Sequence, residues 1–311
     1  MRAVWLREFG GPEVLVPGDA PDPVPGPGQV LVEVAFANTT FVETQFRAGA
    51  PGPFRAELPL IPGNGVGGVI SAVGDGVDPG LAGQRVVTST GGSGGYAQRV
   101  AVDAAAVFPV PPALDLDAAV ALLADGRTAT GLVHATRVRP GDRVLVEAAA
   151  GGVGGLVVQL AHAAGAFVIG AAGGPAKVAH VEGADAVVDY LEPDWAARAG
   201  EVDVVFDGVG GEIGTTAFGL LRPGGRMAVY GLAGGSWAEV SDVDAAAREV
   251  TLVRSIGSPA EMRAFTESAL AEAAAGRLVP VIGQRYPLEK AADAHAAIES
   301  RATVGKTLLV A

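Results

Sequence analysis

The hydrophobic positions change their periodicity at about residue 115. Before that point, short apolar runs alternate with connectors rich in Gly and Pro, a pattern typical of strands joined by turns. The expected strands of this part cover residues 29–37, 65–74 and 83–90, and strand character continues across 97–111. We therefore expect an antiparallel β-barrel or sandwich here.

Beyond residue 115, expected helices and strands alternate. The segment 115–138 has helical composition, and strand–helix pairs follow it. Alternation of this kind predicts a parallel, doubly wound sheet with helices on both faces. The terminal "GKTLLVA" has strand character without a following helix, so we expect it to return to the first part. The other elements expected after residue 138 are strands at 143–149, 166–172, 186–190, 202–210 and 224–232 and helices at 155–165, 176–183 and 260–276.

The loop "AAAGGVGG" (148–155) offers no acid, base or nucleophile. It follows an apolar strand, opens a helix and occupies the first strand-to-helix turn of the alternating part. The spacing Ala149-x-Gly151-x-x-Gly154 matches the dinucleotide-binding pattern, with Ala for the first Gly. Small residues let the backbone approach a pyrophosphate, whose charge is stabilised by the N-terminus of the helix that begins near Gly152. A packing turn without a ligand is the less favoured alternative.

The next expected strand suggests which dinucleotide binds. An NAD site normally has a carboxylate at the end of this strand, where it accepts a hydrogen bond from the ribose 2′-OH. Here the strand ends in "AAGG" (171–174), and Lys177 follows. Lys177 is placed to pair with a 2′-phosphate as a point charge. The sequence thus favours NADPH over NADH, although a solvated role for Lys177 remains open.

Composition excludes several function classes. The net charge of −12 argues against binding to nucleic acid or to an anionic membrane surface. The chain has no Cys, which removes disulfides, thiolate nucleophiles and Cys-containing zinc sites. It has neither a signal-peptide pattern nor an apolar run of about 18 residues. We expect a soluble, cytoplasmic protein.

Several sequence blocks occur together and in order: "IPGNGVGGVISAVGDGV", "GGSGGYAQRV", "RPGDRVLVEAAAGGVGGLVVQLAHAAGA", "GADAVVDY", "DVVFDGVGG", "LRPGGRMAVYG" and "GKTLLV". Over essentially the whole chain they resemble the medium-chain dehydrogenase/reductase superfamily, in particular its zinc-free quinone oxidoreductase (ζ-crystallin-like) branch. The resemblance implies an α/β fold in which a Rossmann domain with a doubly wound parallel sheet is inserted in a GroES-like β-barrel catalytic domain. The implied boundaries are 1–116 for the first part of the catalytic domain, 117–257 for the dinucleotide-binding domain and 258–311 for the return.

The resemblance also implies the cofactor-binding residues. They belong to the glycine loop, the ends of later strands and the terminal "GK", and Val209 and Leu232 among them are equally compatible with ordinary packing. The implied set is Thr128, Gly151, Gly152, Val153, Lys177, Tyr190, Gly208, Val209, Tyr230, Gly231, Leu232 and Lys306.

A catalytic metal is not expected. The zinc-dependent branch of the superfamily requires a Cys and a Gly-His-Glu segment, whereas this chain has no Cys and has "PGNG" (62–65) at that place. The four His residues fall in expected helices and do not form a convincing metal site. They are His134, His162, His180 and His295.

The departures from the family pattern concern mainly the substrate side. Thr40 replaces the usual Asn, although Asn38 lies two positions away, Arg127 replaces a Leu beside Asp125, and Gly65 replaces a Glu. The expected helix that begins at Lys177 is about two residues short, so Lys177 is open to a shift in register. The enoyl-thioester reductases of the superfamily carry a Tyr where this chain has "GAPGPF" (49–54), which argues against that subgroup.

The implied chemistry is hydride transfer. It requires orientation, a dry site and stabilisation of the charge that develops on an oxygen. The expected catalytic groups are Thr40, Tyr96 and Arg127, although a packing role for Tyr96 is equally open and a structural pairing of Arg127 with Asp125 is favoured.

The expected activity is the NADPH-dependent reduction of a small-molecule substrate, a quinone or an α,β-unsaturated carbonyl compound. The alternatives are a tailoring ene-reductase of a biosynthetic pathway, a non-catalytic NADPH-binding sensor or structural protein, and the use of NADH. The resemblance further implies a homodimer that pairs through the edge strand expected within 249–257.

Overall fold

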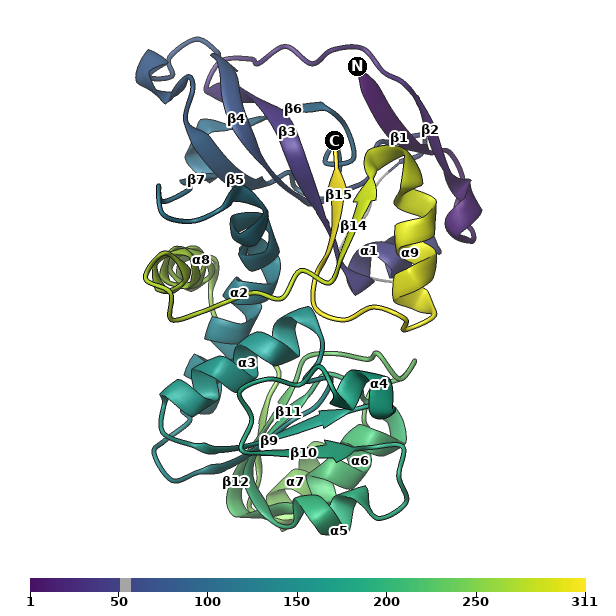
Figure 1. Cartoon of the computed structure of the whole chain (residues 1–311), viewed down its shortest axis with the longest axis vertical. Coiled ribbons are helices and arrows are strands. Elements are labelled where there is room, and N and C mark those ends of the chain that lie inside the picture. The colour runs from purple at the N-terminus through teal and green to yellow at the C-terminus, as the bar shows by residue number, and fades with distance from the viewer. Residues whose placement is uncertain (51–56) are drawn as a thin grey trace. The chain divides into compact units, whose positions relative to one another are not determined.

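The structure of the chain, a computed structural model, describes residues 1–50 and 57–311 and falls into two units (Figure 1). The expected domain boundaries, after residues 116 and 257, remain a prediction. The main segment of unit 2 begins inside the long helix α2 (Leu116–Thr136) and ends inside α8 (Pro259–Ala274), so each of these helices belongs partly to both units. Unit 1 comprises Met1–Ala124, Leu270–Arg277 and Ile282–Ala311, and unit 2 comprises Asp125–Ala269 and Leu278–Val281.

Unit 1 is built on a seven-stranded sheet with the order β14-β15-β3-β4-β5-β7, in which β6 also pairs with β3. Neighbouring strands are antiparallel except β14 and β15, as the turn-rich pattern predicted. The strands of unit 1 are β1 (Arg2–Leu6), β2 (Leu15–Asp19), β3 (Gln29–Thr39), β4 (Gly65–Val73), β5 (Arg85–Ser89), β6 (Arg99–Asp103), β7 (Val107–Pro109), β14 (Gln284–Pro287) and β15 (Thr307–Val310).

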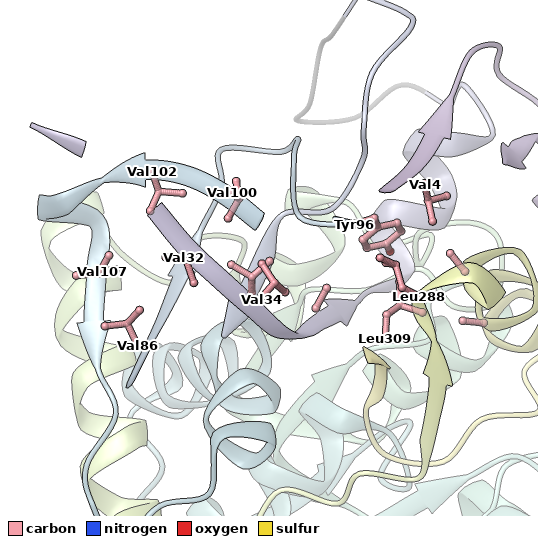
Figure 2. Close-up of a cluster of buried hydrophobic side chains, with 14 of the residues drawn as sticks. Val4, Val32, Val34, Val86, Tyr96, Val100, Val102, Val107, Leu288 and Leu309 are labelled. Atoms are coloured by element: carbon pink, nitrogen blue, oxygen red, sulfur yellow. The ribbon is translucent and has the colours of Figure 1, made fainter. Parts of the chain in front are cut away.

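Strand β3 organises the core of unit 1. Its residues Val30, Val32 and Val34 alternate with more exposed positions, because successive side chains of a strand point to opposite faces. Figure 2 shows Val32 and Val34 among the buried valines of neighbouring strands, with Leu309 of β15 in the same cluster. Strand β15 pairs antiparallel with β3, so the prediction that the terminal segment returns to the first part is confirmed.

Unit 2 contains a six-stranded sheet with the order β10-β9-β8-β11-β12-β13, all parallel. Numbered along the chain, this is the 3-2-1-4-5-6 order of the Rossmann fold, and the order reverses between β8 and β11. The predicted doubly wound sheet is therefore confirmed. Its strands are β8 (Arg143–Val146), β9 (Phe167–Ala172), β10 (Ala186–Asp189), β11 (Val202–Asp207), β12 (Leu221–Val229) and β13 (Thr251–Val253).

Helix α3 begins at Gly152, where the glycine loop predicted a helix start, although the range expected from the apolar pattern began at residue 155. Helix α4 ends at Val178 instead of continuing to residue 183. Helices α1, α5, α6 and α7 had no expected range, and α9 was expected only as a helix around His295. The α-helices not yet given are α1 (Phe41–Arg47), α3 (Gly152–Ala163), α4 (Pro175–Val178), α5 (Trp195–Ala199), α6 (Gly211–Gly219), α7 (Asp242–Ala247) and α9 (Ala291–Glu299).

Within the two described ranges, no helix is both long enough and apolar enough to cross a membrane. Strand β13 is the outermost strand of the parallel sheet, on the side of β12, and lies inside the expected edge 249–257. Pairing of this edge with a second copy remains a prediction.

Tyr96 lies in the core of unit 1 and is fully buried. Its phenol oxygen shares a hydrogen bond of 2.9 Å with Nε2 of the buried His295 in α9, and the two rings meet edge to face. Burial, together with the charge of Arg47, lowers the pKa of His295 to about 3, so the imidazole is neutral at ordinary pH. Burial raises the pKa of the Tyr96 phenol well above its usual value. This environment supports the packing role of Tyr96 over the catalytic one.

Replacing Tyr96 with Phe tests that role. The substitution leaves Nε2 of the buried His295 without its partner, so we expect the free energy of unfolding to fall by about 1–3 kcal/mol. Urea denaturation measures this loss, with Tyr286→Phe on the half-buried strand β14 as the matched control. Unchanged stability combined with lost turnover would instead indicate a catalytic phenol.

Candidate functional site

The glycine loop lies in unit 2, at the carboxyl end of β8. Gly151 is the N-cap residue of α3, with an extended backbone and no side chain to cap the helix. The loop folds back on itself through a 2.8 Å hydrogen bond from the Gly151 amide to the Ala148 carbonyl. At Gly154, a Cβ atom would lie 2.3 Å from the Ala148 oxygen, so only glycine allows this close contact between loop and helix.

This arrangement fits the diphosphate of a dinucleotide. The first amides of a helix have no acceptor within the helix, and here no side chain takes their place. The helix dipole adds partial positive charge at the same point. Gly151, Gly152 and Val153, the three residues expected to line the diphosphate, form this start of α3.

The residues expected on the adenosine side come together at the ends of β9 and β10. Lys177 lies on α4, and its amide donates to the Gly174 carbonyl at 3.0 Å. The Tyr190 ring packs against Gly173, where an added Cβ would be 2.6 Å from Cε2. The carboxylate of Asp189, not anticipated from sequence, accepts the Gly174 amide at 2.9 Å and fixes this turn.

The residues expected on the nicotinamide side lie in the loops after β11 and β12. Tyr230 packs over Gly208, where a Cβ would be 2.6 Å from the phenol oxygen. The amides of Tyr230 and Gly231 both donate to the carbonyl oxygen of Asp207, and the amide of Gly234 donates to the Val209 carbonyl at 2.6 Å. Gly208, Val209, Tyr230, Gly231 and Leu232 therefore belong to one pair of interlocked loops at the same edge of the sheet as the glycine loop.

Two buried acids beside these loops were missed by the sequence analysis. Glu147 directly follows β8 and Asp207 ends β11, and neither is exposed to solvent. Burial and the charge of Asp207 raise the pKa of Glu147 well above its usual value. Burial also raises the pKa of Asp207, while hydrogen bonds from Glu147 and from two amides oppose that rise. The signal was available, because each acid interrupts an apolar run at the carboxyl end of a parallel strand.

The part of α2 in unit 2 carries Asp125, Arg127 and Thr128. Burial lowers the pKa of the Arg127 guanidinium, and the negative charge of Asp125 partly offsets this. The structural pairing of Arg127 with Asp125 that the sequence favoured is therefore present as an electrostatic attraction. Within the described residues, the buried Nε of Arg127 has no hydrogen-bond partner.

In unit 1, Thr40 is the N-cap residue of α1. Its hydroxyl accepts the Glu43 amide at 3.3 Å and donates to Glu43 Oε2 at 3.0 Å, so its proton is already engaged by a carboxylate. The buried Glu43 also accepts the amides of Thr40 and Asn64, at 2.7 and 2.8 Å. Burial raises the pKa of Glu43, and the nearby charge of Lys306 opposes the rise. Lys306 therefore lies beside Glu43 in unit 1, and its contact with a cofactor remains a prediction.

The replacement of a Glu by Gly65 has a steric reason. A Cβ at Gly65 would lie 2.5 Å from Nδ2 of Asn38, which is 2% exposed. Any side chain at position 65 would have to displace Asn38, so the two positions fit each other. Asn38 Oδ1 is buried without a hydrogen-bond partner in the described part of unit 1.

Residues 51–54 of the "GAPGPF" segment, which lacks the Tyr of the enoyl-thioester reductases, lie outside the described residues. Among residues 1–50 and 57–311, no group of three or more His, Asp or Glu side chains is placed to hold a metal ion. Three of the four His residues lie in helices, but His180, expected in one, lies in the turn after α4 because that helix ends early.

Comparisons with known proteins agree with this architecture. The family model described as alcohol dehydrogenase GroES-like domain matches residues 26–112, and the model described as zinc-binding dehydrogenase matches residues 182–309. A quinone oxidoreductase of Rattus norvegicus is 36% identical over 324 residues, which cover 100% of this chain and 98% of the relative. A 2-haloacrylate reductase of a Burkholderia species is 32% identical, covering 99% of this chain and 98% of the relative.

Among solved structures, the quinone oxidoreductase of Escherichia coli complexed with NADPH superimposes with a TM-score of 0.90. It is 29% identical, and the match covers 100% of both chains.

Substitutions at Thr40 test its role as the N-cap of α1. Thr40→Ala removes the N-cap hydroxyl, so we expect a loss of about 0.5–2 kcal/mol in the free energy of unfolding. Thr40→Ser keeps the hydroxyl and should retain nearly all of the stability. If Thr40→Ala unfolds like the wild type in urea, the capping role is refuted.

Proposed function

We propose that this chain, which belongs to the quinone oxidoreductase branch of the medium-chain dehydrogenase/reductase superfamily, is an NADPH-dependent reductase. Its substrates would be quinones or alkenes conjugated to a carbonyl group, and it would act without a metal. The observation that carries the proposal is the uncapped start of α3 after a loop of small residues, at the point where the strand order of the sheet reverses. The NADPH bound to the Escherichia coli relative supports the choice of cofactor.

Each part of the cofactor would have its own residues. Gly151, Gly152 and Val153 would line the diphosphate, with the amides of Gly152 and Val153 as donors, because the Gly151 amide already donates to Ala148. Lys177 would bind the 2′-phosphate, and Tyr190 would pack beside the adenosine. The interlocked loops after β11 and β12 would orient the nicotinamide, with Thr128 and Lys306 contributing further contacts. When bound, NADPH supplies the hydride.

The protein must also stabilise the negative charge that develops on the substrate oxygen. Arg127 is the strongest of the three expected groups, because its guanidinium stays charged and its Nε has no partner within the described residues. The Thr40 hydroxyl donates to Glu43, and the Tyr96 phenol is buried against His295. We therefore assign the charge-stabilising role to Arg127 before Thr40 and Tyr96.

The name of the Burkholderia relative, 2-haloacrylate reductase, favours alkene reduction as the second candidate activity. A haloacrylate is an alkene conjugated to a carboxylate. A tailoring ene-reductase would need the same hydride donor and the same dry site as a quinone reductase, and would differ in the group that receives the hydride.

The loss of NADPH absorbance in the presence of 1,4-benzoquinones and, separately, of short enones tests the activity. We expect oxidation of NADPH with at least one of the two classes, and the faster class identifies the preferred acceptor. Tight NADPH binding without oxidation by either class would contradict the enzyme proposal and favour a cofactor-binding sensor or structural protein.

Lys177→Ala tests the assignment of NADPH over NADH. A hydrogen bond to a charged group contributes about 1.5–3 kcal/mol, so we expect the KM for NADPH to rise on the order of tenfold to a hundredfold. The KM for NADH should hardly change. Lys290→Ala, which removes an exposed ammonium group elsewhere on the chain, is the control. Equal effects of Lys177→Ala on both cofactors would refute contact with the 2′-phosphate.

A further inference from the structure

Glu147 and Asp207 form a buried pair of carboxyl groups at the carboxyl ends of neighbouring parallel strands. Their preceding residues, Val146 and Phe206, are partners in the β8–β11 register. Both acids have no solvent exposure, and in the described residues one oxygen of each, Glu147 Oε1 and Asp207 Oδ2, is buried without a hydrogen-bond partner. The Val209 amide lies between them, 3.3 Å from Glu147 Oε2 and 3.1 Å from Asp207 Oδ1.

The pair is short of hydrogen-bond donors. Asp207 Oδ1 accepts the amides of Val209 and Gly210, the latter at 2.6 Å, and Glu147 Oε2 shares the Val209 amide. Within the described residues, Glu147 Oε1 and Asp207 Oδ2 have no backbone or side-chain N–H donor. Two ionised carboxylates in this position would repel each other in a medium of low dielectric constant. A proton held on one of them removes the repulsion and supplies the missing donor.

The other ionisable groups near the pair do not supply a compensating positive charge. Tyr230, after β12, is neutral, because burial and the charges of Glu147, Asp207 and Asp125 raise the pKa of its phenol. Asp125 on α2 is a further acid, and Arg127 on the same helix interacts with Asp125. The cluster therefore contains three carboxyl groups (Glu147, Asp207 and Asp125) and one guanidinium, which interacts with Asp125. A proton shared by Glu147 and Asp207 lowers the remaining negative charge to one.

We propose that Glu147 and Asp207 share one proton and act as a positioning pair that holds the Val209–Gly210 turn in the shape required beside the nicotinamide. Glu147 carries the proton and donates it in a hydrogen bond to Asp207, which as the carboxylate accepts the Val209 and Gly210 amides. Loss of the proton would place two negative charges under the turn and loosen it. This inference rests on the proposed function, because it takes NADPH as the ligand that contacts the Val209–Gly210 turn.

NADPH binding as a function of pH tests the pair. We expect the wild-type Kd, measured by fluorescence titration, to rise on the alkaline side by up to tenfold per pH unit once the pair loses its proton. Glu147→Gln keeps a neutral hydrogen-bond donor and should bind NADPH without that rise. Glu201→Gln, an exposed acid directly before β11, is the matched control and should follow the wild type. The same alkaline rise in Glu147→Gln and the wild type would overturn the proposal.

Unfolding without any cofactor gives an independent test. The raised pKa of Glu147 means that the folded state binds a proton more tightly than the unfolded state does. The wild-type free energy of unfolding should therefore fall as pH rises from the usual carboxyl range toward the raised pKa, and Glu147→Gln should lack this contribution. The stability difference between the two should widen with pH, by up to tenfold in the unfolding equilibrium constant per unit. A difference that stays constant with pH would refute the shared proton.

The two tests fail in different ways. If the wild type binds no NADPH at any pH, the proposed function is wrong, and urea denaturation still decides whether the pair shares a proton. If NADPH binds and both pH profiles are unchanged by Glu147→Gln, the positioning pair is wrong and the proposed function stands. Asp207→Asn provides a second variant should Glu147→Gln fail to fold. Glu147 can still ionise in this variant, but only one negative charge can then lie under the turn, so the alkaline rise in the Kd for NADPH should be smaller than in the wild type.

Discussion

Backbone amides at the carboxyl edge of the parallel sheet must either find an acceptor or be left for a ligand, and the rest of unit 2 depends on how this requirement is met. At α3 no side chain caps the helix, and its first amides remain available to an anion. One strand away, after β11, the amides of Val209 and Gly210 are fully engaged by Asp207. The same edge of the sheet thus has amides at the start of α3 that can bind a phosphate, and amides after β11 that are already hydrogen-bonded and cannot bind one.

In unit 1, too, a buried carboxylate accepts backbone amides that have no other acceptor. The buried Glu43 accepts the amides of Thr40 and Asn64 and so joins the start of α1 to the segment before β4. Burying a carboxylate is costly unless hydrogen bonds or an opposite charge compensate. Glu43 has both kinds of compensation, because the charge of Lys306 lies nearby. Glu147 has only the shared Val209 amide and another acid, which is why protonation is the remaining means of stabilising it.

The sequence was sufficient for the fold because periodicity and glycine spacing are local signals. The strand at 202–210, the glycine loop and the terminal "GKTLLVA" could each be interpreted from adjacent residues, and their places in the two sheets followed from general rules of topology. The extent of α4 could not be predicted: beyond Val178 the amides of His180 and Val181 donate to carbonyls three positions back, as in a turn, and no residue pattern marks this end. The cofactor residues could be named by resemblance, yet their mutual contacts, such as Tyr190 on Gly173, appear only when separate strand ends are brought together.

The pairs of residues that carry the new arguments are distant in sequence, and no local pattern joins them. Glu147 and Asp207 meet because β8 and β11 are neighbours at the point where strand order reverses, although β9 and β10 lie between them in the chain. Asn38 and Gly65 meet because β3 and β4 pair, so a Gly that looked like a lost Glu is the complement of an Asn on the next strand. In both cases the residue that the neighbouring strand brings close determines what the position can do: Asn38 leaves no space for a side chain at position 65, and Asp207 leaves no acceptable place for a second negative charge at Glu147.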